Sequence, residues 1–344
     1  MAQVSGPGRV LLACASQPVD RVPVWLMRQA GRYLPEYRQL RQHHDFLTLC
    51  ETPDLAAEVT LQPMRRFDLD AAIVFADILL LVRVLGADVA YVEGSGPQVS
   101  GLPAAQDIHF PHLDRVHETL AFVGATVHQV RAQLAADKAV IGFAGAPFTV
   151  LSYLLEGGPS TDFAHTKALM NQDAPTFCRL LAGLAEMTYA YLDLQVAAGA
   201  DVVQVFDSWV GALAASDFKT FVAPVVKDLI QRVRALGVPV IYFAPQTAGY
   251  LREVAGTQPD VVSVDWRISL AEARRLTGGA CQGNLDPAVL RDGPRARIER
   301  EVRRVLDEWG DRPGLIFNLG HGVDRRTPVQ HVHWLVEAVH AGPR

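Results

Sequence analysis

The chain has 344 residues, 49% of them hydrophobic, and a net charge of −5 at pH 7. A mildly acidic chain lacks the broad basic face of nucleic-acid binders, and no run reaches the roughly 20 apolar residues of a membrane span. Four scattered cysteines and an N-terminus without signal-peptide features indicate neither a disulfide framework nor a zinc cluster nor secretion, so we expect a soluble cytoplasmic protein.

Eight short runs rich in β-branched residues recur along the chain, each followed by a turn and a segment of helical periodicity. The runs are almost continuously apolar, which is typical of parallel strands covered on both faces. The predicted strands are 22–26, 71–75, 139–143, 202–206, 238–243, 261–265, 279–284 and 315–319.

Amphipathic segments separate these strands, beginning with 53–66, for which Thr52 is the expected N-cap and Pro53 the first helical residue. The alternation favours an α/β fold, a (β/α)8 TIM-type barrel with extra loops and helices, over a doubly wound sheet. We expect one domain over 1–344 with its core at about 22–340, and an excursion from the barrel over the Gly- and Pro-rich segment 86–112. The further predicted helices are 113–134, 175–198, 217–236, 270–276, 294–309 and 328–339.

Barrel enzymes carry their chemistry at the carboxyl ends of the strands. The first predicted strand, 22–26, is followed by Met27 and Arg28 and then by Gly31 and Arg32, within a segment 21–41 that holds five Arg and one Glu. Arginine binds carboxylate or phosphate through paired hydrogen bonds, which indicates an anion site. Only four of the 32 basic residues are Lys, so Arg is the default cation here and a solvated basic loop is the alternative.

Further candidates follow the other strands. Asp77 stands in an apolar stretch, where it either caps a helix or presents a carboxylate to a cationic or N–H-rich ligand. Tyr153 offers a phenol or simply packs, and Ser208 either binds a ligand or caps a helix, as Asp207 could. His321 lies between two glycines and could be a base, a ligand donor or a loop residue.

Two long segments carry a family resemblance. They are P-V-W-L-M-R-Q-A-G-R-Y-L-P-E-Y-R (23–38) and G-F-A-G-A-P-F-T-V-L-S-Y-L-L-E-G-G (142–158), joined in order by F-A-D-I-L, V-F-D-S-W, Q-G-N-L-D-P and F-N-L-G-H-G. Together they resemble the uroporphyrinogen decarboxylase family from about Pro23 to His340. The resemblance implies a cytoplasmic homodimeric carboxy-lyase of haem biosynthesis. Such an enzyme removes four acetate carboxylates from the tetrapyrrole uroporphyrinogen III, giving coproporphyrinogen III and four CO2, with no cofactor, metal, nucleic acid or membrane partner.

The resemblance also implies site residues. Asp77 would stabilise a cationic transition state, with Arg28 and Tyr153 as further catalytic residues. Arg41 matches an additional arginine of the family's cleft, whereas the loop Asp324–Arg326 departs from a family pattern that commonly has proline there. The implied substrate contacts are Arg28, Gln29, Ala30, Gly31, Arg32, Asp77, Tyr153, Ser208 and His321.

Two rival functions stay open at this point. A corrinoid-linked methyltransferase shares the barrel, but its zinc–thiol chemistry needs His and Cys ligands, and no H-x-C pattern is present. A non-catalytic tetrapyrrole-binding protein would bind the same substrate without releasing CO2.

Overall fold

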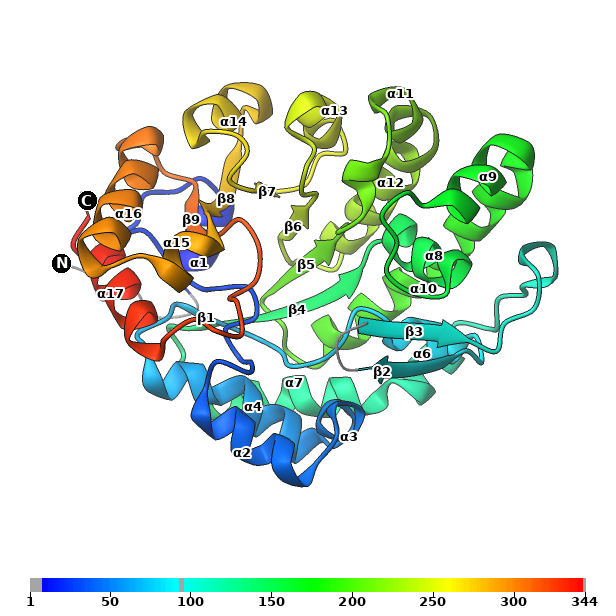
Figure 1. Cartoon of the computed structure of the whole chain (residues 1–344), viewed down its shortest axis with the longest axis horizontal. Coiled ribbons are helices and arrows are strands. Elements are labelled where there is room, and N and C mark those ends of the chain that lie inside the picture. The colour runs from blue at the N-terminus through cyan, green and yellow to red at the C-terminus, as the bar shows by residue number, and fades with distance from the viewer. Residues whose placement is uncertain (1–7, 93–95, 343–344) are drawn as a thin grey trace.

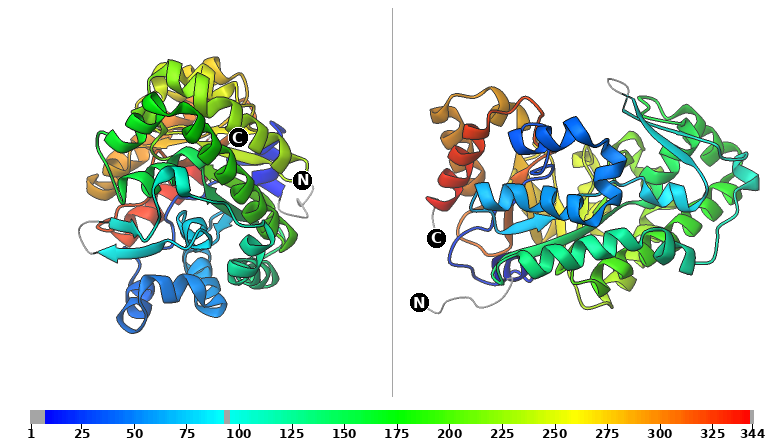
Figure 2. Two further views of the ribbon diagram at one scale, coloured as in Figure 1. Left: turned by 90° about the vertical axis from the view of Figure 1, so that its right-hand side faces the viewer. Right: turned by 90° about the horizontal axis from the view of Figure 1, so that it is seen from below.

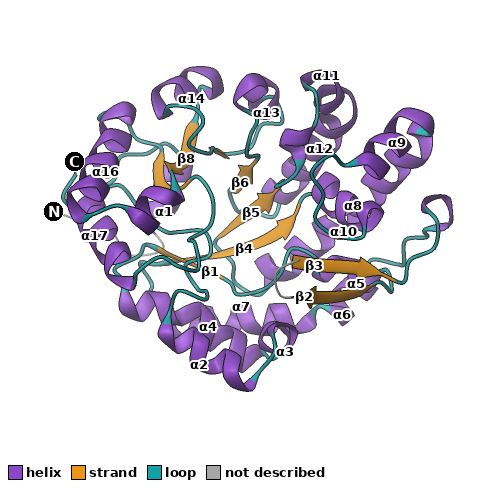
Figure 3. Cartoon of the chain, viewed as in Figure 1, coloured by secondary structure: helices purple, strands orange, loops and turns teal. Residues whose placement is uncertain are grey.

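Seven parallel strands curl into one sheet, seen in a computed structural model that describes residues 8–92 and 96–342. Helices surround this sheet on its outer side (Figure 1; purple around orange in Figure 3). In spatial order the strands are β1 (Ala71–Ile73), β4 (Ala139–Gly145), β5 (Val202–Phe206), β6 (Val240–Phe243), β7 (Val261–Ser263), β8 (Ala280–Leu285) and β9 (Leu315–Leu319). Every one lies within one or two residues of a predicted strand.

The run predicted as the first strand, 22–26, pairs at one position only. Val24 bridges Phe317 of β9, and the Phe317 N–H donates to the Pro23 carbonyl (2.8 Å). On its other side, the Asp70 N–H donates to the Val24 carbonyl (2.8 Å), and the Val24 N–H donates to the Asp70 carboxylate (2.9 Å). Pro23 has no N–H to extend the ladder. The segment nevertheless joins β9 to β1 and closes the ring.

Side chains that point into the ring form an apolar core distinct from the layer between sheet and helices. Helix α1 (Gly8–Cys14) adds Val10 and Ala13 to this inner core, and so plugs one end of the barrel. Alternate residues of the same strands, such as Val203 and Val205, pack outward against the helices. Burial on both faces explains why the strand sequences are continuously apolar. The inner core includes Trp25, Ile73, Ile141, Phe143, Val202, Ile241, Phe243 and Ile316.

The outer helices follow the prediction with local changes. The 53–66 helix forms as α4 (Pro53–Arg66), although Thr52 caps it without a side-chain hydrogen bond. The predicted 113–134 helix is divided into α6 (Asp114–Thr119) and α7 (Ala121–Gln133). The predicted 217–236 helix begins as a wide π-type turn before α12 (Ala223–Arg234), where Pro224 lacks the N–H of a regular turn. The other predicted helices are α10 (Ala174–Ala197), α14 (Leu270–Thr277), α16 (Arg295–Trp309) and α17 (Val329–His340).

The excursion after residue 86 is an antiparallel hairpin of β2 (Asp88–Val92) and β3 (Gly96–Ser100). It lies outside the ring in Figures 1 and 2 and packs on α5 (Leu80–Val84) and α8 (Pro147–Glu156). The Val99 N–H donates to the Gly157 carbonyl (2.8 Å), which anchors the hairpin to the end of α8. The remaining helices are α2 (Pro35–His43), α3 (Phe46–Glu51), α9 (Ala164–Gln172), α11 (Ala215–Asp217), α13 (Leu251–Ala255) and α15 (Pro287–Asp292).

Candidate active site

The turn that carries Arg28 is braced by Gln29. The Gln29 side-chain amide donates to the Ala71 carbonyl (3.0 Å), and its oxygen accepts from the Leu26 N–H (3.0 Å). The Tyr33 hydroxyl donates to the Gln29 carbonyl (2.8 Å). Gln29 is fully buried, so its side chain fixes the turn to β1, and its predicted contact with substrate stays a prediction.

Arg28 lies where the first and last strands meet. The Met27 N–H donates to Asn318 Oδ1 (3.0 Å), and the Val323 N–H donates to the Met27 carbonyl (2.8 Å). Arg28 itself has a φ of 59°, a left-handed conformation that costs a non-glycine residue about 1–3 kcal/mol. Its stem lies over Gly322, where a Cβ atom would come 2.3 Å from Arg28 Cδ. The Arg28 stem therefore occupies the space that a side chain at Gly322, the second glycine of G-H-G, would fill.

The arginines of segment 21–41 divide into paired and open groups. Arg21 forms ion pairs with acidic side chains, whereas Arg38 and Arg41 donate to backbone carbonyls. The guanidinium groups of Arg28 and Arg32 have no hydrogen bond or ion pair within 8–92 and 96–342, and both side chains are exposed. Two cations are thus left free for an anion from outside.

The backbone of the same turn is open as well. The N–H groups of Ala30, Gly31 and Arg32 donate to no acceptor in the described part of the chain. At Gly31 a Cβ atom would sit 3.3 Å from the Arg28 carbonyl, so glycine suits this tight path. Successive free N–H groups in a turn form a concave site for anionic oxygen. The turn therefore offers amides beside its two guanidinium groups.

Asp77 follows β1 and forms a turn of its own. Its carboxylate accepts from the Leu79 N–H (2.7 Å), although Leu79 rather than Asp77 precedes helix α5, so Asp77 does not cap that helix. The Asp77 side chain as a whole is half-buried, and protein atoms surround its carboxylate. Burial raises the pKa of Asp77, against the lowering effects of the Leu79 N–H, Tyr91 and Arg28. No cation contacts this carboxylate among residues 8–92 and 96–342.

Tyr153 and Ser208 come from neighbouring parts of the ring. Tyr153 lies on α8 and packs on Trp209, with ring centroids 5.8 Å apart. Burial raises the pKa of Tyr153 to about 12, so its hydroxyl stays protonated and can donate. Ser208 is the residue before Trp209, in the turn after β5, and is half-buried. It makes no cap hydrogen bond to the helical turn that follows.

His321 lies beside the Arg28 stem at the end of β9. Its ring meets Phe243 edge-on, with centroids 6.4 Å apart, and keeps an exposed face. Enclosure by protein lowers the pKa of His321 to about 4, helped by Arg28 and Arg267 and opposed by Asp265. The imidazole is therefore neutral at neutral pH. It can donate one hydrogen bond and accept another.

Arg28 brings the predicted residues together. Besides burial, which dominates in each case, its charge lowers the pKa of Asp77, Tyr153 and His321, so all three lie within its electrostatic reach. Arg32 lies in the same turn and acts instead on the pKa of Tyr37, below the effects of burial, Arg41 and Cys50. Asp77, Tyr153 and His321, which come from separate strand ends, thus lie around Arg28 at one mouth of the barrel.

Sequence reasoning missed two parts of this mouth. Phe143, Phe206 and Phe243 point inward at the ends of three adjacent strands, with centroids 5.5 and 5.8 Å apart, and form an apolar floor. Each is the last residue of an apolar run, which could have identified them. Tyr91 lies on the unpredicted hairpin beside Asp77, and its buried hydroxyl has no hydrogen-bond partner of normal geometry among the residues that the structure describes.

The loop that departs from the family pattern is held by ion pairs. Asp324 accepts from the Arg326 guanidinium (3.1 Å) and from Arg291 (3.2 Å) of α15. These contacts lower the pKa of Asp324. The loop is thereby tied to helix α15.

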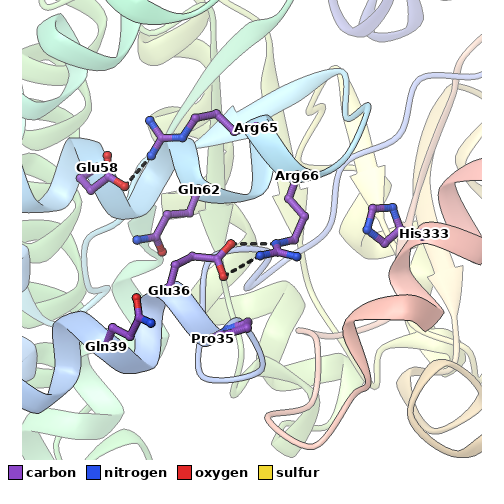
Figure 4. A pocket seen from close by; sticks show the side chains of 8 residues that line it. All are labelled: Pro35, Glu36, Gln39, Glu58, Gln62, Arg65, Arg66 and His333. Atoms are coloured by element: carbon purple, nitrogen blue, oxygen red, sulfur yellow. Dashed lines mark hydrogen bonds and ion pairs between the residues drawn. The ribbon is translucent and has the colours of Figure 1, made fainter.

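One cavity in the described part of the chain lies away from these residues. It measures about 660 Å³ on the outer helices α2, α4 and α17, and contains none of the predicted site residues (Figure 4). Its charges are paired with one another, Glu36 with Arg66 (2.8 Å) and Glu58 with Arg65. None of the predicted strand-end residues lines this groove, and its acidic and arginine side chains neutralise one another, so we place the site at the barrel mouth.

Two general features bear on the rivals. Within 8–92 and 96–342, no three His, Cys, Asp or Glu side chains are grouped so that they could hold a metal ion. In the same residues no helix has the length and apolar character needed to cross a bilayer.

Comparison with known proteins decides the family. Residues 7–342 match the family described as uroporphyrinogen decarboxylase (URO-D). The chain belongs to the uroporphyrinogen decarboxylase family. It is 45% identical to the uroporphyrinogen decarboxylase of Solibacter usitatus, with 96% of each chain covered. It is also 45% identical to that of Sorangium cellulosum, with 98% of this chain and 97% of the relative covered.

Membership of the uroporphyrinogen decarboxylase family confirms the predicted class, a carboxy-lyase of porphyrin biosynthesis. Solved structures confirm the (β/α)8 fold. A methyltransferase from Methanosarcina mazei superimposes with a TM-score of 0.84 over 98% of both chains, at 21% identity. At that identity the likeness concerns the fold alone, so it does not favour the methyltransferase rival.

Proposed function

We propose that this chain, as one barrel domain with its core at about 22–340, converts uroporphyrinogen III to coproporphyrinogen III. Four acetate side chains lose CO2 and become methyl groups, without cofactor or metal. The observation that carries the proposal is that two guanidinium groups and an enclosed carboxylate follow strand ends of the same barrel, and none of the three has an ion-pair partner among the described residues. That arrangement suits a substrate that is anionic at its rim and becomes cationic at its centre.

The reaction needs a place for the electrons of the broken C–C bond. Protonation of a pyrrole ring carbon gives an iminium cation, which accepts those electrons as CO2 leaves. A second proton then reaches the exocyclic carbon, while the first returns to the medium as the ring becomes aromatic again. Each acetate thus takes up one proton and releases one CO2. The pyrrole supplies the electron sink that other decarboxylases obtain from a cofactor.

Asp77 suits the task of stabilising that cation. Its carboxylate can accept the pyrrole N–H groups, and the inward-facing rings of Phe143, Phe206 and Phe243 offer the substrate an apolar surface in the same barrel. A fixed charge in a dry site, aimed at charge that develops in the transition state, contributes about 10²–10³-fold in rate. Burial raises the pKa of Asp77 because it disfavours the charged carboxylate. A cationic ring held beside Asp77 would favour the charged form again.

The rim residues suit the substrate's carboxylates. Arg28 and Arg32 provide free guanidinium groups, and the open N–H groups at 30–32 add neutral donors. Ser208 and neutral His321 can donate single hydrogen bonds to further carboxylates. Tyr153 is placed to orient Asp77 or the ring above it. The net charge of −5 makes such a local cationic rim necessary to attract an anion.

We further propose that the protein acts in the cytoplasm as a homodimer, as the family resemblance implies. Sedimentation of the purified chain would give about twice the monomer mass of 37.5 kDa. A monomer at assay concentration would contradict this part of the proposal.

The function is tested by anaerobic incubation with enzymatically prepared uroporphyrinogen III. The expected product, after oxidation and mass spectrometry, carries four carboxylates in place of eight, with matching CO2 release. Tight binding with all eight carboxylates retained would identify a non-catalytic binding protein instead. Stoichiometric zinc in the purified protein, together with methyl transfer to a thiol, would point to the methyltransferase rival.

A further inference from the structure

A buried carboxylate lies directly behind the proposed substrate residues. Asp207, the residue directly after β5, is fully buried. Its two oxygens accept from the Thr149 hydroxyl (2.7 Å) and the Tyr242 hydroxyl (2.7 Å). Within the described residues no cation pairs with it. Burial raises the pKa of Asp207 to about 6, against these hydrogen bonds, so the ionised form predominates at neutral pH.

The three side chains join separate elements of the barrel. Thr149 lies in the first turn of α8, four residues before Tyr153 and hence one helical turn below it. Asp207 is the residue before Ser208, and Tyr242 is on the adjacent strand β6. A single carboxylate therefore fixes β5 to both β6 and α8.

A second contact connects this cluster to the mouth. The Trp209 N–H donates to Thr149 Oγ1 (3.2 Å), so Thr149 both gives a hydrogen bond to Asp207 and accepts one from the turn that follows Ser208. Trp209 in turn packs against the Tyr153 ring. Asp207 is thus connected to Tyr153 by two hydrogen bonds, through Thr149 to Trp209, and by the contact between the Trp209 and Tyr153 rings. It is connected to Ser208 as its neighbour in the chain.

We propose that Asp207, Thr149 and Tyr242 form a positioning device that sets Ser208 and Tyr153 against the substrate. The inference rests on the proposed function, because it concerns the placement of substrate-facing groups. The three residues touch no substrate themselves. A buried carboxylate without a cation lowers the stability of the folded state. The two hydrogen bonds that it accepts from hydroxyl groups are nevertheless strong and directional. That combination fixes geometry at the expense of stability, as residues that support active sites do.

The test is a set of double-mutant cycles in the full-length enzyme. Thr149→Val keeps the side-chain shape but removes both hydrogen bonds. We expect it to lower kcat by about tenfold with KM changed by less than about threefold, because small displacements of positioning groups cost rate. In a Tyr153→Phe or Ser208→Ala background, Thr149→Val should lower kcat by less than about threefold, because it acts through the Tyr153 and Ser208 side chains.

Matched controls separate positioning from general destabilisation. Thr126→Val removes a buried hydroxyl that bonds only the Phe122 carbonyl (2.8 Å) on α7, and should leave kcat unchanged in all backgrounds. Where Thr149→Val does not fold, Tyr242→Phe removes one donor to Asp207 and keeps the ring, with the same pattern expected. An equal loss of kcat in all backgrounds, or a wild-type kcat in both variants, would overturn the inference. A wild-type enzyme that releases no CO2 would instead overturn the proposed function.

Discussion

The glycine under Arg28 offers a sharp test of the anion clamp. A Cβ atom at Gly322 would lie 2.3 Å from Cδ, 2.6 Å from Cγ and 3.0 Å from Nε of Arg28. Ordinary carbon–carbon contacts are about 3.5–4.0 Å, so Gly322→Ala moves the Arg28 stem by more than about 1 Å. The left-handed backbone of Arg28 restricts how the stem can move away.

The expected loss is in activity rather than in stability. Hydrogen bonds to a charged group contribute about 1.5–3 kcal/mol, so a displaced guanidinium lowers kcat/KM by about 10- to 100-fold. Gly322 does not need a positive φ, and the Arg28 guanidinium has no hydrogen bond to lose within 8–92 and 96–342, so the free energy of unfolding should change by less than about 0.5 kcal/mol.

The assay is kcat/KM with uroporphyrinogen III under anaerobic conditions, together with urea unfolding. Gly249→Ala is the matched control, because a Cβ atom there meets nothing within 4 Å and should leave kcat/KM unchanged. A Gly322→Ala enzyme with wild-type kcat/KM would refute the placement of Arg28 against substrate.

Three further predictions concern the charges of the mouth. Arg28→Ala should weaken the dependence of kcat/KM on salt concentration, because one screened contact with a substrate carboxylate is lost; an unchanged slope would count against carboxylate capture. Tyr91→Phe should move the acid limb of the kcat/KM profile to higher pH, since Tyr91 lowers the pKa of Asp77, which must be ionised to act; no shift would exclude this contact. When unreactive uroporphyrin binds at pH 5–6, His321 should take up a proton, because the ligand's carboxylates raise its pKa from about 4. Calorimetry in buffers of different ionisation enthalpy measures this proton uptake. The uptake should be absent in His321→Ala.

The sequence predicts the barrel well because its strands are buried on both faces. Continuous apolar runs located all seven strands of the sheet, and their ends located Arg28, Asp77, Ser208 and His321. It overestimates the pairing of 22–26, since a run cannot reveal that Pro23 limits the ladder to one bridge at Val24.

Contacts between distant segments were beyond sequence reasoning. The hairpin of β2 and β3 is a local structure in a Gly- and Pro-rich stretch without clear periodicity, so Tyr91 could not be placed beside Asp77. The requirement for glycine at 322 is equally non-local, because the side chain that excludes a Cβ atom there belongs to Arg28, almost 300 residues earlier. Asp207 appeared as a possible helix cap, and its two hydroxyl partners come from other elements.

The most direct test of the central claim is the rate of CO2 release by Asp77→Asn in a single turnover with enzyme in excess. We predict a rate about 10²–10³-fold below wild type, because the amide cannot balance the cationic intermediate. The free energy of unfolding of Asp77→Asn at pH 7 should not be lower than that of the wild type. Burial raises the pKa of Asp77, so ionisation of this carboxylate destabilises the folded state as the pH rises through that pKa. Asparagine has no charge and so avoids this destabilisation. A folded Asp77→Asn enzyme that releases CO2 within about tenfold of the wild-type rate would contradict the account.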